Sequence, residues 1–121
     1  MKKILIVDDV KRIRGIYVKL LTAEGFEVIE ASSAGEAQEI LKRERIDLIL
    51  LDIKMPEANG NMVNISYEIV KLFRKKCKVI VTSVYSLGEQ KQIVTEVSDY
   101  YDKSQGIDIL LAKVRKVLKD G

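Results

Sequence analysis

The stretch Ile46–Pro56, IDLILLDIKMP, decides the fold of this chain. Four consecutive aliphatic residues, Leu48 to Leu51, are followed by one carboxylate, Asp52. Such a short unbroken apolar run is typical of a strand buried on both faces of a parallel sheet. Pro56 prevents the strand from continuing, so Asp52 is expected where the strand leaves the core. Ligands of open α/β sheets bind at this carboxyl end of the strands, which makes Asp52 the first candidate functional residue.

The rest of the chain alternates between predicted strands and helices. Short apolar runs predict further strands at Ile4–Val7 and Lys78–Val81. Alternating apolar residues predict an edge or near-edge strand at Phe26–Ala31, and the tyrosine-rich segment Ser98–Asp102 is interpreted as another strand. Apolar residues at helical spacing predict helices over Val10–Ala23, through Met62–Leu72 and from Ile107 to Leu118. Two capping boxes, at Ser33 and Ser86, predict the starts of two more helices. The helix after Ser86 is expected to carry Ile93, Val94 and Val97 on its apolar face. About five βα units in alternation predict one α/β domain over residues 1–121, with a parallel sheet and helices on both faces.

Composition excludes several classes of function. A net charge of +3 over 121 residues is too small to indicate a nucleic-acid partner. No apolar stretch approaches the ~20 residues of a membrane span, and no signal peptide is expected. The single Cys77 fits a reducing cytoplasm, and we interpret it as a passive thiol despite the lysines beside it. The absence of histidine excludes imidazole general bases and zinc ligands.

Polar residues end several of the predicted strands: Asp8 and Asp9, Asp52, Thr82 and Lys103. Because parallel strands end at the same edge of a sheet, we expect these side chains to meet in one cleft. Three close carboxylates repel each other, so at least one pKa must rise unless a cation joins them. Their hard oxygen ligands favour Mg²⁺ over zinc. A lysine and a hydroxyl beside them suit a phosphoryl group on or near Asp52, whose carboxylate is a competent nucleophile.

The ordered motifs resemble the receiver domain of two-component response regulators. They are ILIVDD at Ile4–Asp9, LLDIKMP at Leu50–Pro56 followed by Gly60, VTS at Val81–Ser83, and the run Tyr100–Lys103. The resemblance covers essentially the whole chain. It implies a flavodoxin-like, doubly wound five-stranded sheet of order 2-1-3-4-5.

The resemblance also implies the chemistry of the cleft. Asp52 would accept a phosphoryl group from a phosphohistidine of a sensor histidine kinase or a histidine phosphotransfer protein. Asp9 would bind Mg²⁺ directly and Asp8 largely through water, with Asp52 and the backbone carbonyl of Lys54 completing the ligands. The chain would be a phosphoacceptor that assists its own phosphorylation and dephosphorylation, and not a dedicated enzyme.

Other residues would transmit the signal if the resemblance holds. Lys103 would pair with the phosphoryl oxygens. Thr82 would move toward the phosphoryl group, and Tyr100 would change rotamer as the space behind Thr82 changes. The output surface would be the last βα units, about Ser86–Lys119, acting on a downstream protein target or on a fused output domain that this sequence lacks.

The chain departs from the family after Lys103. A proline joined by a cis peptide is usual there, followed by an aromatic residue, but this chain has Ser104 and Gln105. A cis bond to a residue other than proline costs about 2.5–4 kcal/mol, so we expect a trans Lys103–Ser104 peptide. Gly106 is expected to absorb the change in path through a positive φ. Asn61 and Asn64 also replace residues that are commonly apolar.

Three other readings compete with a phosphorylated receiver. A flavodoxin-type flavin binder would cradle phosphate in its first loop, where Asp8 and Asp9 would repel it. A phosphatase with an aspartyl-phosphate intermediate would need an acid at position 54, which is Lys54. A pseudo-receiver that binds protein partners without phosphorylation remains the alternative.

Overall fold

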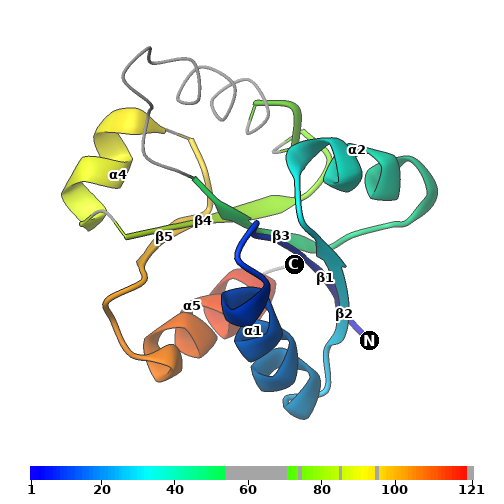
Figure 1. Cartoon of the computed structure of the whole chain (residues 1–121), viewed down its shortest axis with the longest axis horizontal. Coiled ribbons are helices and arrows are strands. Elements are labelled where there is room, and N and C mark those ends of the chain that lie inside the picture. Colours follow the sequence, from blue (N-terminus) through cyan, green and yellow to red (C-terminus); the bar gives the residue numbers. More distant parts are fainter. Residues whose placement is uncertain (54–70, 74, 85, 95, 120–121) are drawn as a thin grey trace.

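A computed structural model describes residues 1–53, 71–73, 75–84, 86–94 and 96–119. Within these residues one five-stranded parallel sheet is built from β1 (Lys3–Val7), β2 (Glu27–Ala31), β3 (Leu48–Asp52), β4 (Lys78–Ser83) and β5 (Asp99–Asp102). The strand order is β2-β1-β3-β4-β5, which confirms the predicted flavodoxin-like sheet (Figure 1).

The central strand β3 is buried on both faces, as its unbroken apolar run predicts. Ile49 and Leu51 belong to one hydrophobic cluster, whereas Leu48 and Leu50 belong to the other. All four side chains are at most 4% exposed. Because side chains alternate along a strand, only a strand covered on both sides requires four apolar residues in succession.

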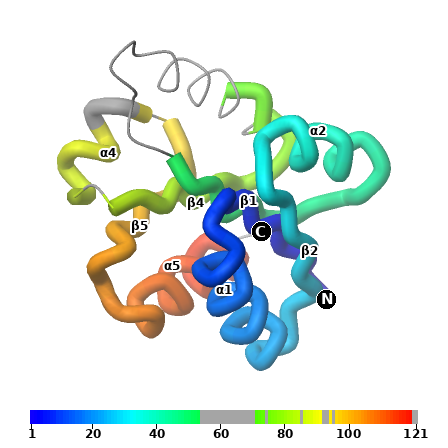
Figure 2. Tube along the Cα trace, in the orientation of Figure 1, coloured from blue at the N-terminus to red at the C-terminus, as the bar shows by residue number. Residues whose placement is uncertain are grey.

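Helices cover both faces of the sheet (Figures 1 and 2). Helices α1 (Lys11–Ala23) and α5 (Ile107–Lys119) lie on one face, with Leu21 and Val114 in the cluster beneath them. Helices α2 (Ala34–Arg43) and α4 (Leu87–Ile93) lie on the other face. None of the helices described is long and apolar enough to cross a membrane.

Both predicted capping boxes begin a helix. The Ser33 hydroxyl accepts a hydrogen bond from the Glu36 amide at 3.1 Å and opens α2. The Ser86 hydroxyl accepts one from the Glu89 amide at 3.3 Å and opens α4. These bonds satisfy amides that have no partner within the first turn of a helix.

The structure corrects two predicted core positions, Leu72 and Ile107, and the end of one predicted helix, although Val97 beyond that helix still packs against the core. Leu72 is 48% exposed because Phe73, which is fully buried, occupies the core position beside it. Ile107 is 41% exposed at the first position of α5. Helix α4 ends at Ile93 because Val94 adopts an extended backbone, so Val97 lies beyond the helix. Most of the helix predicted through Met62–Leu72, with Gly60, Asn61 and Asn64, falls outside the described residues.

Candidate functional site

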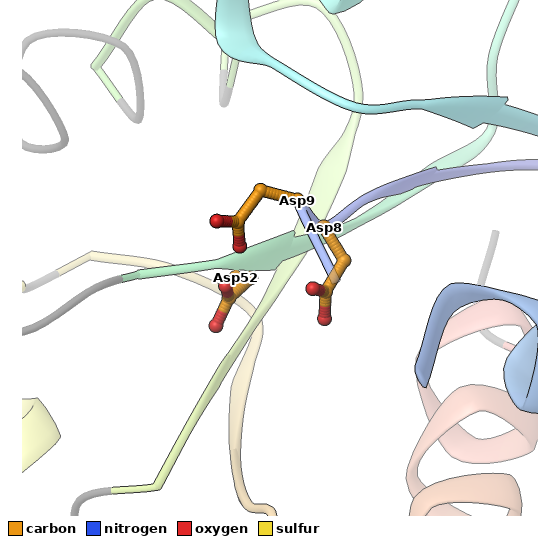
Figure 3. Close-up of side chains that lie close together, drawn as sticks. All are labelled: Asp8, Asp9 and Asp52. Atoms are coloured by element: carbon orange, nitrogen blue, oxygen red, sulfur yellow. The ribbon is translucent and has the colours of Figure 1, made fainter. Parts of the chain in front are cut away.

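Three carboxylates meet at the carboxyl ends of the neighbouring strands β1 and β3 (Figure 3). Val7 and Leu51 are partners in register, so Asp8 and Asp52 leave the sheet side by side. One carboxylate oxygen each of Asp8, Asp9 and Asp52 lies within 4.8 Å of the others. Asp8 is buried, Asp52 is half-buried and Asp9 is exposed, so the cluster opens to solvent on the side of Asp9. The sequence prediction that these acids converge is confirmed.

Asp8 is held at both its backbone and its side chain. Its amide donates to the Ala31 carbonyl of β2 at 3.1 Å, and its carboxylate accepts from the Val10 amide at 2.9 Å. The Arg14 guanidinium donates to the Asp8 carbonyl at 2.7 Å and to the Glu30 carboxylate at 2.8 Å. The loop that carries Asp8 and Asp9 is therefore tied to β2 and to α1.

Lys103 brings a positive charge into the acidic cluster from the end of β5. Its ammonium nitrogen lies 2.9 Å from an Asp52 carboxylate oxygen and 3.0 Å from an Asp8 carboxylate oxygen. The side chain of Lys103 is 14% exposed, that of Asp52 is 9% exposed and that of Asp8 is 1% exposed. Lys103 thus neutralises part of a buried negative charge, and the expectation that it points into the acidic cleft is confirmed.

Burial and charge act against each other at this ion pair. Burial raises the pKa of Asp52, the neighbouring charges of Asp8 and Asp9 raise it further, and Lys103 only partly offsets the rise. Burial alone would lower the pKa of Lys103, but its hydrogen bonds to Asp52 and Asp8 and their attraction raise it overall. Lys103 therefore stays charged, whereas Asp52 holds its proton more tightly than an exposed aspartate.

Thr82 lies on β4, the strand next to Asp52, and Tyr100 lies on β5, one strand further from it. Thr82 is in register with Asp52 on one side and with Tyr101 on the other, and its side chain is buried. The Tyr100 hydroxyl donates to the Val94 carbonyl, just after α4, at 2.6 Å. Tyr100 therefore links β5 to the end of α4, while Thr82 stands directly beside the acid.

The Lys103–Ser104 peptide is trans, as predicted, because the described residues contain no cis peptide. The prediction for Gly106 is wrong, since its φ is not positive. The turn is instead held by Asp102, whose carboxylate accepts hydrogen bonds from the Ser104 amide at 2.8 Å and the Ser104 hydroxyl at 2.7 Å. These two bonds lower the pKa of Asp102.

The thiol of Cys77 is partly buried at the start of β4. Burial raises its pKa to about 11, and the charge of Asp47 adds to the rise. A thiol with so high a pKa is almost entirely protonated at neutral pH and is a poor nucleophile. This agrees with its interpretation as a passive thiol.

Sequence reasoning missed two features of the site. Arg14 carries no motif signal, because it reads as one more polar position between the apolar residues Ile13 and Tyr17 of α1. The sequence also does not predict the contact of Lys103 with Asp8, because these two residues lie 95 positions apart in the chain.

The donor set fits a divalent cation of the magnesium class. The carboxylate oxygens of Asp8, Asp9 and Asp52 are hard ligands, and their spacing allows one ion to touch all three. Lys103 already shows that a cation is favoured between two of these acids. Lys54, the remaining predicted ligand, lies outside the described residues.

Solved structures with the same fold extend over the whole chain. The response regulator protein TrrA from Thermotoga maritima, in complex with Mg(2+)-BeF, is 32% identical with a TM-score of 0.76, covering 97% of this chain and 99% of that one. Another response regulator from Thermotoga maritima is 27% identical with a TM-score of 0.83, covering 98% of each chain. A CheY-like receiver domain protein from Methanospirillum hungatei JF-1 is 29% identical with a TM-score of 0.75, covering 100% of this chain and 99% of that one.

Curated relatives are longer than this chain. A probable transcriptional regulator, ycf27, from Porphyra purpurea is 35% identical over 98% of this chain and 48% of its own length. The transcriptional regulatory protein CpxR of Escherichia coli K12 is 32% identical over 98% of this chain and 50% of its own length. This chain therefore spans about half the length of these relatives. Residues 4–115 match the response regulator receiver domain, and together with the fold and the acidic cluster this shows that the chain belongs to the receiver-domain family of two-component response regulators.

Proposed function

We propose that Asp52 is a phosphoacceptor and that its phosphorylation, supported by Mg²⁺, switches the last βα units between two states. The observation that carries the proposal is the Lys103 ammonium held 2.9 Å from Asp52 and 3.0 Å from Asp8, beside three converging carboxylates. Such a site pairs a nucleophilic carboxylate with cationic groups that neutralise transferred phosphoryl oxygens.

The phosphoryl donor would be the phosphohistidine of a sensor histidine kinase or of a histidine phosphotransfer protein. An Asp52 carboxylate oxygen attacks phosphorus, a P–O bond forms, and the P–N bond breaks with the electron pair leaving on the imidazole. Lys103, freed from the Asp52 carboxylate, then pairs with a phosphoryl oxygen. Asp9, Asp52 and the carbonyl of Lys54 would hold Mg²⁺ directly and Asp8 largely through water, and the bound ion would supply positive charge to the phosphoryl oxygens.

The output would pass through Thr82 and Tyr100. Thr82 stands in register beside Asp52, so its hydroxyl can follow the phosphoryl group. Space vacated behind Thr82 lets Tyr100 change rotamer and release its hydrogen bond to Val94. The end of α4 and the outer face of β5 and α5 would change together, which suits a downstream protein target or a fused output domain.

The chain would act in the cytoplasm as a signalling module and not as a dedicated enzyme. The single thiol of Cys77, without a cysteine partner in the sequence, is compatible with a reducing compartment. A pseudo-receiver that binds its partners without phosphorylation is the competing function. A pseudo-receiver would not need a lysine that contacts two acids. The contacts of Lys103 with both Asp8 and Asp52 therefore favour the phosphorylated receiver.

Intact-mass spectrometry after treatment with acetyl phosphate tests the proposal. The chain should gain one phosphoryl mass when Mg²⁺ is present and none with a chelator, and hydroxylamine should remove the adduct. Asp52→Asn should abolish it. Asp47→Asn is the matched control. Asp47 lies just before the amino end of β3, the same strand that Asp52 ends, so the loss of its charge should leave labelling intact. A label that persists in Asp52→Asn moves the acceptor elsewhere, and a folded chain that never labels supports the pseudo-receiver.

A further inference from the structure

We propose that Asp102 is a positioning residue that aims Lys103 at the acidic cluster. Asp102 is the last residue of β5, and Lys103 follows it directly. No proline follows this lysine, because Ser104 stands there, and the Lys103–Ser104 peptide is trans. The turn is held instead by a set of hydrogen bonds centred on Asp102.

One oxygen of the Asp102 carboxylate accepts two hydrogen bonds from the same residue. The Ser104 amide donates to it at 2.8 Å and the Ser104 hydroxyl at 2.7 Å. The backbone of Asp102 is also engaged, because its carbonyl accepts from the Gln105 amide at 2.9 Å and its amide donates to the Gln105 side-chain oxygen at 3.3 Å. A charged acceptor makes such bonds shorter and stronger than neutral ones. Residue 104 is therefore held against residue 102, with Lys103 between them.

The lysine backbone is fixed from the other side by the sheet. The Lys103 amide donates to the Ser83 carbonyl of β4 at 2.7 Å. The far end of the turn is tied down by the Tyr101 hydroxyl, which donates to the carbonyls of Gln105 at 2.7 Å and Gly106 at 3.1 Å. The backbone is therefore held by hydrogen bonds on both sides of Lys103 and at the Lys103 amide itself.

This anchoring matters because the lysine side chain is long and rotatable. Its ammonium must stay within about 3 Å of Asp52 and Asp8 although four methylene groups separate it from the backbone. A small displacement of a group that contacts the reacting centre can slow a reaction by up to about 100-fold. The expected effect on the phosphorylation rate rests on the proposed function, whereas the expected effect on the position and order of the Lys103 ammonium does not.

The experiment compares four variants in the unphosphorylated, Mg²⁺-free protein and then in phosphorylation. Asp102→Ala removes the acceptor, Asp102→Asn keeps an acceptor oxygen in the same place, and Ser104→Ala removes only the hydroxyl bond. Asp99→Ala is the matched control, since Asp99 lies at the opposite end of β5, accepts from the Tyr100 amide at 2.7 Å and pairs with Lys113 at 3.6 Å. The ¹⁵N order parameter of the Lys103 ammonium, assigned by its loss in Lys103→Arg, is measured in each.

Asp102→Ala should lower the order parameter of the Lys103 ammonium, and Asp102→Asn should restore it in part, because a neutral amide oxygen accepts weaker hydrogen bonds than a carboxylate. Asp99→Ala should leave it at the native value even if the variant is less stable. The phosphorylation rate with acetyl phosphate should fall by up to about 100-fold in Asp102→Ala and recover in part in Asp102→Asn. A wild-type chain that is never phosphorylated would refute the proposed function, while the order parameters would still decide the role of Asp102.

A Lys103 ammonium as ordered in Asp102→Ala as in the wild type overturns the proposal. The proposal also fails if Asp99→Ala disorders Lys103 equally, because the effect would then come from lost stability. If Asp102→Ala does not fold, Ser104→Ala decides the question: a partial loss of order supports the proposal, and a native value overturns it.

Discussion

Lys103 and Asp8 are 95 residues apart in the sequence, yet the lysine ammonium donates to the aspartate carboxylate over 3.0 Å. The same ammonium lies 2.9 Å from Asp52. Asp8 and Asp52 have side chains only 1% and 9% exposed, so neither carboxylate is well solvated. Lys103 therefore compensates two buried acids at once, and we expect the stability of the Mg²⁺-free domain to depend on it.

Replacing Lys103 by methionine should destabilise the chain by about 3–5 kcal/mol without Mg²⁺, because it leaves buried charge without its partner. Urea unfolding with a chelator measures this loss. Added Mg²⁺ should restore stability more strongly in Lys103→Met than in the wild type, since the ion would no longer compete with the ammonium. Lys42→Met is the control, because Lys42 is 69% exposed and its pair with Glu39 contributes less than about 1 kcal/mol. Equal effects of the two variants would contradict the prediction.

The raised pKa of Asp52 predicts how the free energy of unfolding depends on pH. A folded-state pKa above the ordinary 3.8 means that the folded chain binds this proton more tightly than the unfolded chain. The contribution of Asp52 to stability is therefore most favourable below 3.8 and is lost as the pH rises through the raised pKa. The free energy of unfolding is measured for the wild type and for Asp52→Asn in the presence of a chelator. As the pH rises across this window, the wild-type value minus the Asp52→Asn value should fall and then stay constant. A difference that rises instead would show that Lys103 outweighs burial.

Mg²⁺ should stabilise the fold by binding only the folded chain. The gain is about 2.7 kcal/mol at a hundred times the dissociation constant, and thermal melts measure it. Asp9→Asn should lose most of this increment and could be more stable than the wild type without Mg²⁺, because it removes repulsion within the cluster. Asp47→Asn should keep the full increment, although it weakens a 2.8 Å bond from the Lys3 amide. Wild-type melts that do not respond to Mg²⁺ would count against the site.

Tyr100→Phe should loosen the end of α4. The variant loses the hydroxyl bond to the Val94 carbonyl, at a cost of about 1 kcal/mol. Hydrogen exchange of the Val94 amide, which donates to Gln90 at 2.9 Å, should become faster. Tyr101→Phe is the matched control, because its hydroxyl bonds the turn before α5 and not α4. Equal acceleration in both variants would remove the proposed link between Tyr100 and α4.

Local patterns in the sequence predict the sheet well. Leu48–Leu51 predicts a strand covered on both faces, and the position of Asp52 after it predicts the edge at which the acids gather. Ser33 and Ser86 predict the starts of two helices, since a cap depends on residues within one turn. The errors at Leu72 and Ile107 arose at helix ends, where periodicity does not tell which neighbouring residue faces the core.

By itself, then, the sequence determined the alternation of strands and helices, the family resemblance and the convergence of Asp8, Asp9 and Asp52. These follow from burial patterns and from the common direction of parallel strands. Only the tertiary structure decided that one lysine contacts two acids, that Arg14 donates to the carbonyl of Asp8, and that the Asp102 carboxylate accepts both hydrogen bonds from Ser104. Such contacts depend on side-chain reach and on hydrogen-bond geometry, which are set where distant segments pack together and leave no periodic trace in the chain.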